Sequence, residues 1–301
     1  MVTSMRARRA ICVSRDEGVR RIVAQALAEA GVAIEHVDAL PADCSHAALV
    51  VVDRATRQQA GDQLRSIAAP VVVVGDDLDD DGLITLMLEQ PVSHLVEDPS
   101  DRRLGVTSAK LASGDVFGIE KYLAEGACIG ERSLRAEDDR RRTVDEVCAW
   151  AETVGARKPV IHRITSVVDE LLMNAQREAT PAADGTGAGA AARRVVVRWA
   201  CDGETLAISV GDGLGTLRQR DIIDHLRRAR ADRGRPQPAA LSSSGGAGLG
   251  LYLVLANVAS LVVNVAAGRR TEVVCLFELA PRSQPAVGAG VRSLHVFHTV
   301  S

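Results

Sequence analysis

Residues 242–254 read SSSGGAGLGLYLV and place four glycines in the six positions 245–250, directly before a run of apolar residues. Glycine costs conformational entropy on folding, so such a loop suits a backbone that needs positive φ angles or close approach to another group. A helix that begins here would offer unpaired N–H groups and the positive end of its dipole, both of which suit a phosphate. A flexible linker is the alternative, because short glycine motifs also recur by chance.

The composition is that of a globular protein. Its 301 residues are enough for two domains, and 47% apolar and 25% charged residues exclude a disordered chain. The net charge of −3 and the 2% aromatic content give no argument for binding nucleic acid or an anionic membrane. No run approaches the roughly 20 apolar residues of a membrane span. The six cysteines are scattered without a CxxC pair. We therefore expect a cytoplasmic protein with reduced cysteines and neither nucleic acid nor membrane as a partner.

Strand and helix patterns alternate in the N-terminal third of the chain. AICVS (10–14), ALVVVD (48–53) and PVVVVG (70–75) have the apolar character of buried strands, and DEGVRRIVAQALAEAG (16–31) has a helical pattern. This alternation predicts a doubly wound α/β domain with a parallel sheet over residues 1–103.

A different order of elements follows. We place a helical connector at 104–135 and a second domain at 136–281. The tail 282–301 is expected to add an edge strand at SLHVF. The second domain opens with two helical patterns and continues with two β-hairpins, the first of which turns at Asp202–Gly203. These patterns are EDDRRRTVDEVCAWAETVG, PVIHRITSVVDELLMNAQREA, RRVVVRWACDGETLAISVGDG and SLVVNVAAGRRTEVVCLFEL.

The second of these helices carries three polar residues beside an apolar stripe. At about 100° per residue, Glu170, Asn174 and Arg177 share one edge. A carboxylate, a carboxamide and a guanidinium can together polarise a nucleophile, coordinate a hard cation and contact phosphate. A solvated helix face would have a similar sequence, so the three residues alone leave both readings open. The stripe itself consists of Ile164, Val167, Val168, Leu171, Leu172 and Ala175.

Three sequence boxes occur in a fixed order: Glu-x-x-x-Asn on a helix, VGDGLG (210–215) after a strand, and GGAGLGL (245–251) opening a helix. This order resembles the GHKL-type ATP-binding domain shared by gyrase, MutL, histidine kinases and anti-sigma-factor serine kinases. TEVVCLFEL (271–279) resembles the closing strand of that family. The resemblance implies a Bergerat-type α/β sandwich, in which a layer of helices covers a mixed, mostly antiparallel sheet.

The same resemblance implies ATP and Mg²⁺ as ligands. Glu170 would be the base or orient water, and Asn174 would bind magnesium. Asp212 would accept a hydrogen bond from the adenine amino group. Arg-, Pro- and Ser-rich residues 227–245 would form a lid over the nucleotide. The remaining expected nucleotide-binding residues are Arg177, Gly215, Gly246, Gly248, Leu249, Gly250 and Thr271.

The first glycine box departs from the family pattern. The family has Asp-x-Gly-x-Gly, whereas Asp212-Gly213-Leu214-Gly215 is one residue shorter. Either Asp212 is the adenine-binding residue in a tightened turn, or Gly211 takes its place and the contact is lost. We favour Asp212, because Ser209 and Val210 complete a strand that ends at this carboxylate.

The N-terminal domain resembles a response-regulator receiver domain in a degenerate form. Asp53 matches the phosphorylated aspartate of that family. Ser14–Arg15 replace its acidic pair and leave only Asp16 nearby, Gly75 replaces a threonine or serine, and Glu97–Asp98 stand where a lysine is expected. Magnesium binding and the countercharge of a phosphoryl group are both weakened. The pattern favours Asp53 as a strand-end turn residue over a phosphoacceptor.

These observations predict a signalling protein related to two-component systems. The helix at 138–153 contains no histidine, which argues against a sensor histidine kinase. We expect Mg-ATP binding that is regulated by the receiver-like domain, with phosphorylation of a protein partner as an activity. A non-catalytic scaffold that works through protein contacts is the alternative. The expected partners are a signalling protein and ATP, with a second copy of the chain as a further candidate.

Overall fold

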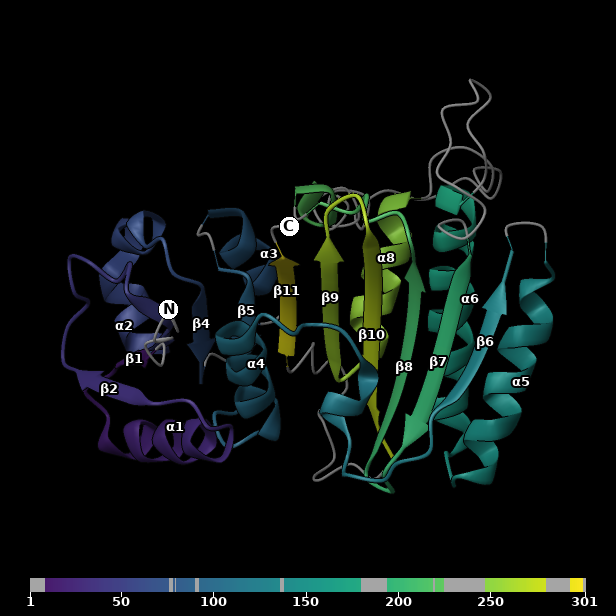
Figure 1. The fold of residues 1–301 in the computed structure, drawn as a ribbon, viewed down its shortest axis with the longest axis horizontal. Helices are drawn as coiled ribbons and strands as arrows, with labels where there is room; N and C mark the ends of the chain where they lie inside the picture. Colours follow the sequence, from purple (N-terminus) through teal and green to yellow (C-terminus); the bar gives the residue numbers. More distant parts are fainter. Residues whose placement is uncertain are drawn as a thin grey trace, which may run out of the picture. The chain divides into compact units, whose positions relative to one another are not determined.

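The computed structural model describes residues 9–75, 78, 80–89, 92–135, 138–179, 194–218, 220–224, 247–279 and 293–299 (Figure 1). Gly246 and the expected lid at 227–245 lie outside the described residues. The chain divides into two compact units. The first comprises Met1–Val116 and Arg292–His295, and the second comprises Phe117–Val291 and Val296–Ser301.

The first unit contains a parallel sheet with the strand order β2-β1-β3-β4-β5. This is the order of flavodoxin-like doubly wound folds. The predicted parallel sheet is therefore confirmed, and Ser293–His295 add an antiparallel segment beside β5. The strands are β1 (Arg9–Val13), β2 (Ile34–Val37), β3 (Ala47–Asp53), β4 (Val71–Val74) and β5 (His94–Val96).

The helices of this unit begin at aspartate caps. The Asp16 carboxylate accepts from the first amides of α1 (Glu17–Glu29), Asp53 caps α2 (Arg54–Ala60), and Asp101 caps α4 (Arg102–Ser113). Each cap satisfies backbone donors that a helix start leaves unpaired. Helix α1 packs against α4, and both contribute buried leucines to the core beside the sheet. The unit also contains the 3₁₀ helix η1 (Gly61–Ser66) and α3 (Asp80–Glu89).

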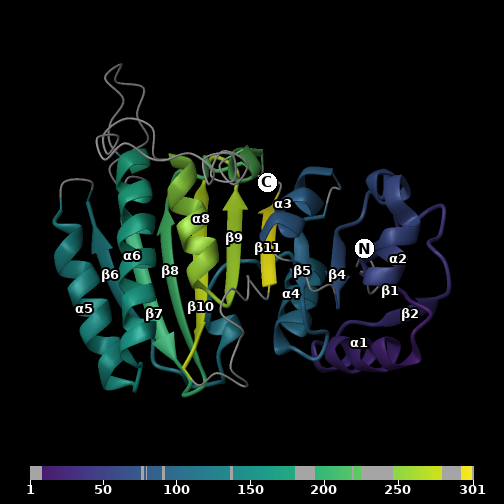
Figure 2. The same cartoon turned by 180° about the vertical axis from the view of Figure 1, so that it is seen from behind.

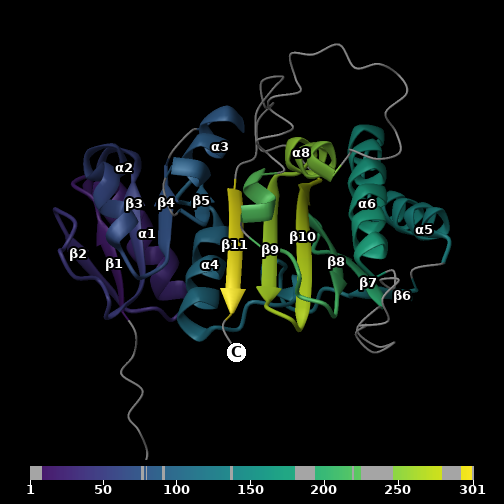
Figure 3. The same ribbon diagram turned by 90° about the horizontal axis from the view of Figure 1, so that it is seen from above.

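The second unit contains a mostly antiparallel sheet covered on one face by helices α5, α6 and α8 (Figure 3). Its strand order is β11-β9-β10-β8-β7-β6. Its strands are β6 (Gly130–Leu134), β7 (Val195–Cys201), β8 (Thr205–Asp212), β9 (Ser260–Ala266), β10 (Arg270–Glu278) and the part of β11 (Ser293–Thr299) that follows His295. Its helices are η2 (Ile119–Tyr122), α5 (Arg140–Thr153), α6 (Lys158–Ala179) and α8 (Ala247–Asn257).

The predicted hairpin at 193–213 is confirmed. Strands β7 and β8 pair antiparallel, and Gly203 takes a positive φ of 94° in the turn between them. The Asp202 carboxylate accepts from the Thr205 amide at 2.8 Å and closes the turn. Aspartate followed by glycine suits this position because the side chain replaces a backbone acceptor and glycine tolerates the left-handed conformation.

The predicted apolar stripe of α6 is also confirmed. Its six residues are buried, from 0% exposure at Ile164 and Leu172 to 9% at Ala175. His162 of the same helix is exposed. Among the helices of the described ranges, none is long and apolar enough to span a bilayer.

The segment 104–135 differs from the expected helical connector. Helix α4 already covers its first part and belongs to the first unit, whereas Gly130–Leu134 form strand β6 at the edge of the second unit's sheet. Beside β6, the Trp199 indole occupies the space where a Cβ of Gly130 would lie. The strand is half exposed, so its sequence lacks the apolar run by which the buried strands are identified.

The six cysteines are free thiols, and Cys12, Cys44 and Cys275 are buried. Burial raises the pKa of Cys12 to about 11, although the nearby Arg20 opposes this rise. A thiol with such a pKa remains protonated and unreactive at neutral pH. The buried cysteines thus behave as small core residues.

A cationic cluster is buried where residues 293–295 meet β5. His94 and His295 are opposite each other in the antiparallel ladder, and their rings stack with centroids 5.7 Å apart. Thr107 Oγ1 lies 3.4 Å from His295 Nδ1, and the positive charges of Lys110 and Arg103 on α4 act on the same ring. Burial lowers the pKa of His295 well below its usual range, and His94, Lys110 and Arg103 add to that shift.

We expect the first unit to lose stability as the pH falls below about 6.5. His295 stays neutral in the folded chain but takes up a proton when unfolded, so acid favours unfolding. By linkage, this one histidine raises the unfolding constant about tenfold for each pH unit below its unfolded pKa. Urea unfolding at pH 7.5 and 5.5 should show a smaller loss for His295→Gln than for the wild type. The exposed His162→Gln is the control, and an equal acid loss in both variants would contradict the assignment.

Candidate functional site

Glu170 and Asn174 lie together on α6, as the sequence predicts, and both are half-buried. Asn174 Nδ2 donates to Glu170 Oε1 at 2.9 Å. The Glu170 carboxylate also reaches the fourth residue of α8 and occupies the space where a Cβ of Gly250 would lie. The predicted helix edge and the end of the glycine-rich stretch are therefore in direct contact.

Asp212 and Thr271 form a second pair. They are opposite each other in the ladder between the end of β8 and the start of β10. Thr271 is 5% exposed, and its hydroxyl has no hydrogen-bond partner among the described residues. An unsatisfied buried hydroxyl costs free energy unless a ligand or water completes it.

Burial raises the pKa of the Asp212 carboxyl, and the nearby Glu178 adds to this shift. The amides of Leu214 and Gly215 donate to Asp212 Oδ1 at 2.8 and 3.3 Å, and they oppose the rise. The nearby Thr271 hydroxyl also opposes the rise. A half-buried carboxylate beside a buried hydroxyl can recognise a donor and an acceptor on one planar ligand.

Gly215 has a packing role. It has a positive φ of 62°, and a Cβ would overlap the backbone of Ala266, Gly268 and Arg269 in the turn between β9 and β10. The Gly268 amide donates to the Gly215 carbonyl at 3.1 Å. Gly215 thereby fixes the loop that follows Asp212.

Four of the element ends around these two pairs lie at one end of the second unit. Figures 1 and 2 show the end of α6, the start of α8, the end of β8 and the start of β10 at this end. Arg177 lies further along α6 and is exposed. Gly248 and Leu249 are in the first turn of α8.

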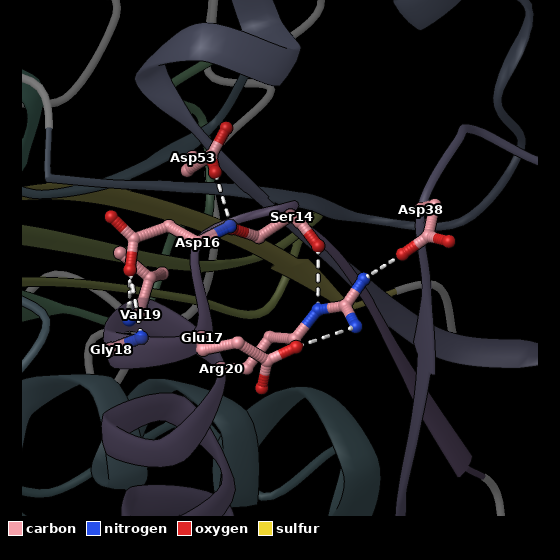
Figure 4. A network of polar contacts seen from close by, with 8 residues as sticks. All are labelled: Ser14, Asp16, Glu17, Gly18, Val19, Arg20, Asp38 and Asp53. Carbon is pink, nitrogen blue, oxygen red and sulfur yellow. Dashed lines mark hydrogen bonds and ion pairs between the residues drawn. The ribbon is translucent and has the colours of Figure 1, made fainter.

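In the first unit, Asp53 lies at the carboxyl end of β3, next to the end of β1 (Figure 4). The residue is 8% exposed, and both oxygens of its carboxylate accept hydrogen bonds. The Ser14 hydroxyl donates to Oδ2, and the Thr56 amide donates to Oδ1 at 2.6 Å. Asp53 therefore links the ends of two strands and caps α2, in agreement with the expectation of a turn residue.

Arg20 completes this network from α1. Its Nε donates to the Ser14 carbonyl at 2.6 Å, and its guanidinium pairs with Asp38 and with Glu17. Sequence patterns do not point to Arg20 or Asp38, or to the Ser14 hydroxyl as a partner of Asp53. The Arg20–Asp38 and Ser14–Asp53 contacts join residues that are 18 and 39 positions apart.

A cavity of about 470 Å³ opens beside Asp53. It lies at the carboxyl ends of β1 and β3, where the strand order of the sheet reverses direction. Doubly wound folds usually bind their ligands at this switch point. Its charged lining consists of Arg15, Asp16, Asp38 and Asp53. Within the described part of either unit, no three His, Cys, Asp or Glu side chains gather as a metal site.

No protein-family model matches the chain, and no curated protein matches its sequence. Among solved structures, the SiaB–SiaC complex from Pseudomonas aeruginosa is similar with a TM-score of 0.32 and 16% identity. The match covers 48% of this chain and 88% of that chain. A likeness at this level carries no argument about fold or function, so the assignment of a function depends on the chemistry of the sites.

We expect no stable phosphorylation of Asp53 by small phosphodonors. Both carboxylate oxygens already accept hydrogen bonds, and Ser14 stands where a metal-binding acid would be needed to neutralise the transferred group. Intact-mass spectrometry after acetyl phosphate treatment should show unmodified protein. A single phosphate adduct that disappears in Asp53→Ala would contradict this expectation.

Proposed function

We propose that the second unit binds Mg-ATP and that the chain is a cytoplasmic signalling protein of the GHKL type. The observation that carries this proposal is the Asp212–Thr271 pair, a half-buried carboxylate beside a buried hydroxyl without a partner among the described residues. An adenine edge presents an amino donor to the carboxylate and a ring nitrogen to the hydroxyl. The unsatisfied hydroxyl thus fits the purine that the sequence resemblance implies.

The α6 edge supports the phosphate end of the same proposal. The Asn174 carboxamide oxygen is a hard ligand of the kind that Mg²⁺ takes alongside phosphate oxygens. Its amide nitrogen donates to Glu170, which leaves that oxygen available to a cation. ATP supplies the transferable phosphoryl group, and Glu170 is the residue that would hold a proton from a water or a partner hydroxyl.

The first unit fits a regulatory rather than a chemical role. The Ser14 hydroxyl and the Thr56 amide each donate a hydrogen bond to one oxygen of Asp53. In this unit the carboxylate therefore has a structural role in place of the phosphoacceptor role that it has in receiver domains. We propose that it acts through protein contacts on the ATP-binding unit or on a protein partner. Phosphorylation of such a partner is the activity we assign to the whole chain.

Mg-ATP should bind weakly and raise the melting temperature of the wild type. A ligand that binds only the folded state at 100 times its Kd stabilises it by about 2.7 kcal/mol. Thr271→Val keeps the side-chain shape and removes the buried hydroxyl, so the free protein should stay folded while ATP affinity falls. Calorimetry and thermal unfolding measure the two effects separately.

Variants of α6 and α8 test the phosphate end. Asn174→Ala should abolish the dependence of binding on magnesium, Glu170→Ala should retain binding and stop turnover, and Gly248→Val should prevent binding. Asp169→Ala is the matched control, because Asp169 is an acid of the same helix that pairs instead with Arg140. If millimolar Mg-ATP gives neither heat nor a thermal shift, the ATP proposal fails and a non-catalytic scaffold takes its place.

A further inference from the structure

Gly250 has unusual surroundings for a glycine within a helix. It lies in the fourth position of α8, is buried, and has an ordinary helical φ rather than a left-handed one. Conformational freedom therefore does not explain the glycine, and within a helix glycine is less stable than alanine. A reason for this costly choice must come from the space around its Cα.

That space is filled by a carboxylate. A Cβ at Gly250 would overlap the Cγ, Cδ and Oε1 atoms of Glu170. The same Oε1 accepts from Asn174 Nδ2 at 2.9 Å, so the carboxylate is held between the carboxamide of its own helix and the backbone of α8. Displacing it by the width of a methyl group would also break its contact with Asn174.

We propose that Gly250 is a positioning residue for Glu170 rather than a phosphate-binding glycine. Its missing side chain lets α8 approach α6 closely enough to fix the carboxylate beside Asn174. The catalytic consequence rests on the proposed function, whereas the steric coupling between the two residues does not. Gly248 and Gly250, which are equivalent in the sequence motif, thereby have different tasks.

The steric part predicts a reversal of sign in protein stability. In the wild type, Gly250→Ala should lower the melting temperature, because the new methyl group meets the Glu170 carboxylate. In the Glu170→Ala protein the space is empty, so the same substitution should raise the melting temperature through the better helix propensity of alanine. Where Gly250→Ala does not fold alone, recovery of folded protein in the Glu170→Ala background is the equivalent supporting result.

The catalytic part predicts a separation of turnover from binding. Gly250→Ala should lower kcat about a hundredfold, as a misplacement of about 1 Å can do. Its Kd for Mg-ATP should stay within about threefold of the wild type, unlike that of Gly248→Val. Glu170→Asp shortens the side chain and makes room, so adding Gly250→Ala to it should cost less turnover than adding it to the wild type.

The results separate the two proposals. An equal effect of Gly250→Ala on stability with and without the Glu170 side chain overturns the positioning role, whatever the protein binds. A reversal of sign without any binding of Mg-ATP retains the steric role and overturns the proposed function. A third outcome also overturns the inference. If Gly250→Ala loses ATP binding and costs as much turnover in the Glu170→Asp protein as in the wild type, Gly250 is a phosphate-binding residue.

Discussion

Burial of the apolar stripe of α6 fixes the geometry of the candidate site. Ile164, Val168 and Leu172 have no exposed surface, and each such side chain stabilises the fold by about 1.5–3 kcal/mol relative to exposure. A rotation of the helix that moved Glu170 away from α8 would bring part of this stripe into water. The orientation of the polar edge is therefore a consequence of the core, and Glu170 and Asn174 have little freedom to leave it.

The register between β8 and β10 has an equivalent role for Asp212 and Thr271. A slip of one residue would move every side chain of β10 to the other face of the sheet. Glu272, the next residue along, is 1% exposed and accepts hydrogen bonds from the Gly118 amide and from Asn264 Nδ2. A slip would leave this carboxylate buried without its donors, which is strongly unfavourable. The Glu272 contacts, on the other face of the sheet, thus maintain the register of β10 that places Thr271 opposite Asp212.

Patterns within single elements could be predicted from the sequence. The stripe of α6, the Asp202–Gly203 hairpin turn and the apolar strand runs of the first unit depend on residues that are close in the chain, and the structure agrees with them. Strand β6 was missed because it is a half-exposed edge strand with only one fully buried residue. The Ser14–Asp53 bond was missed because it joins residues 39 positions apart, a separation at which periodicity carries no information.

Glycine shows most clearly why the site could be predicted only in part. The sequence motifs treat their glycines alike, whereas the structure gives Gly215 a left-handed turn against the β9–β10 backbone and gives Gly250 a carboxylate in place of a side chain. The difference lies in what occupies the position of the absent Cβ, and that neighbour comes from another element.

The same reasoning explains how a shortened glycine box can still present Asp212. Its Oδ1 accepts from the amides of Leu214 and Gly215, so the turn is closed by the aspartate itself and needs no further residue. Gly215 then rests on the β9–β10 turn, where the Gly268 amide binds its carbonyl. The carboxylate is fixed on one side by its own turn and on the other by the ladder that pairs it with Thr271. The length of the box therefore matters less than the two contacts that hold its first residue in place.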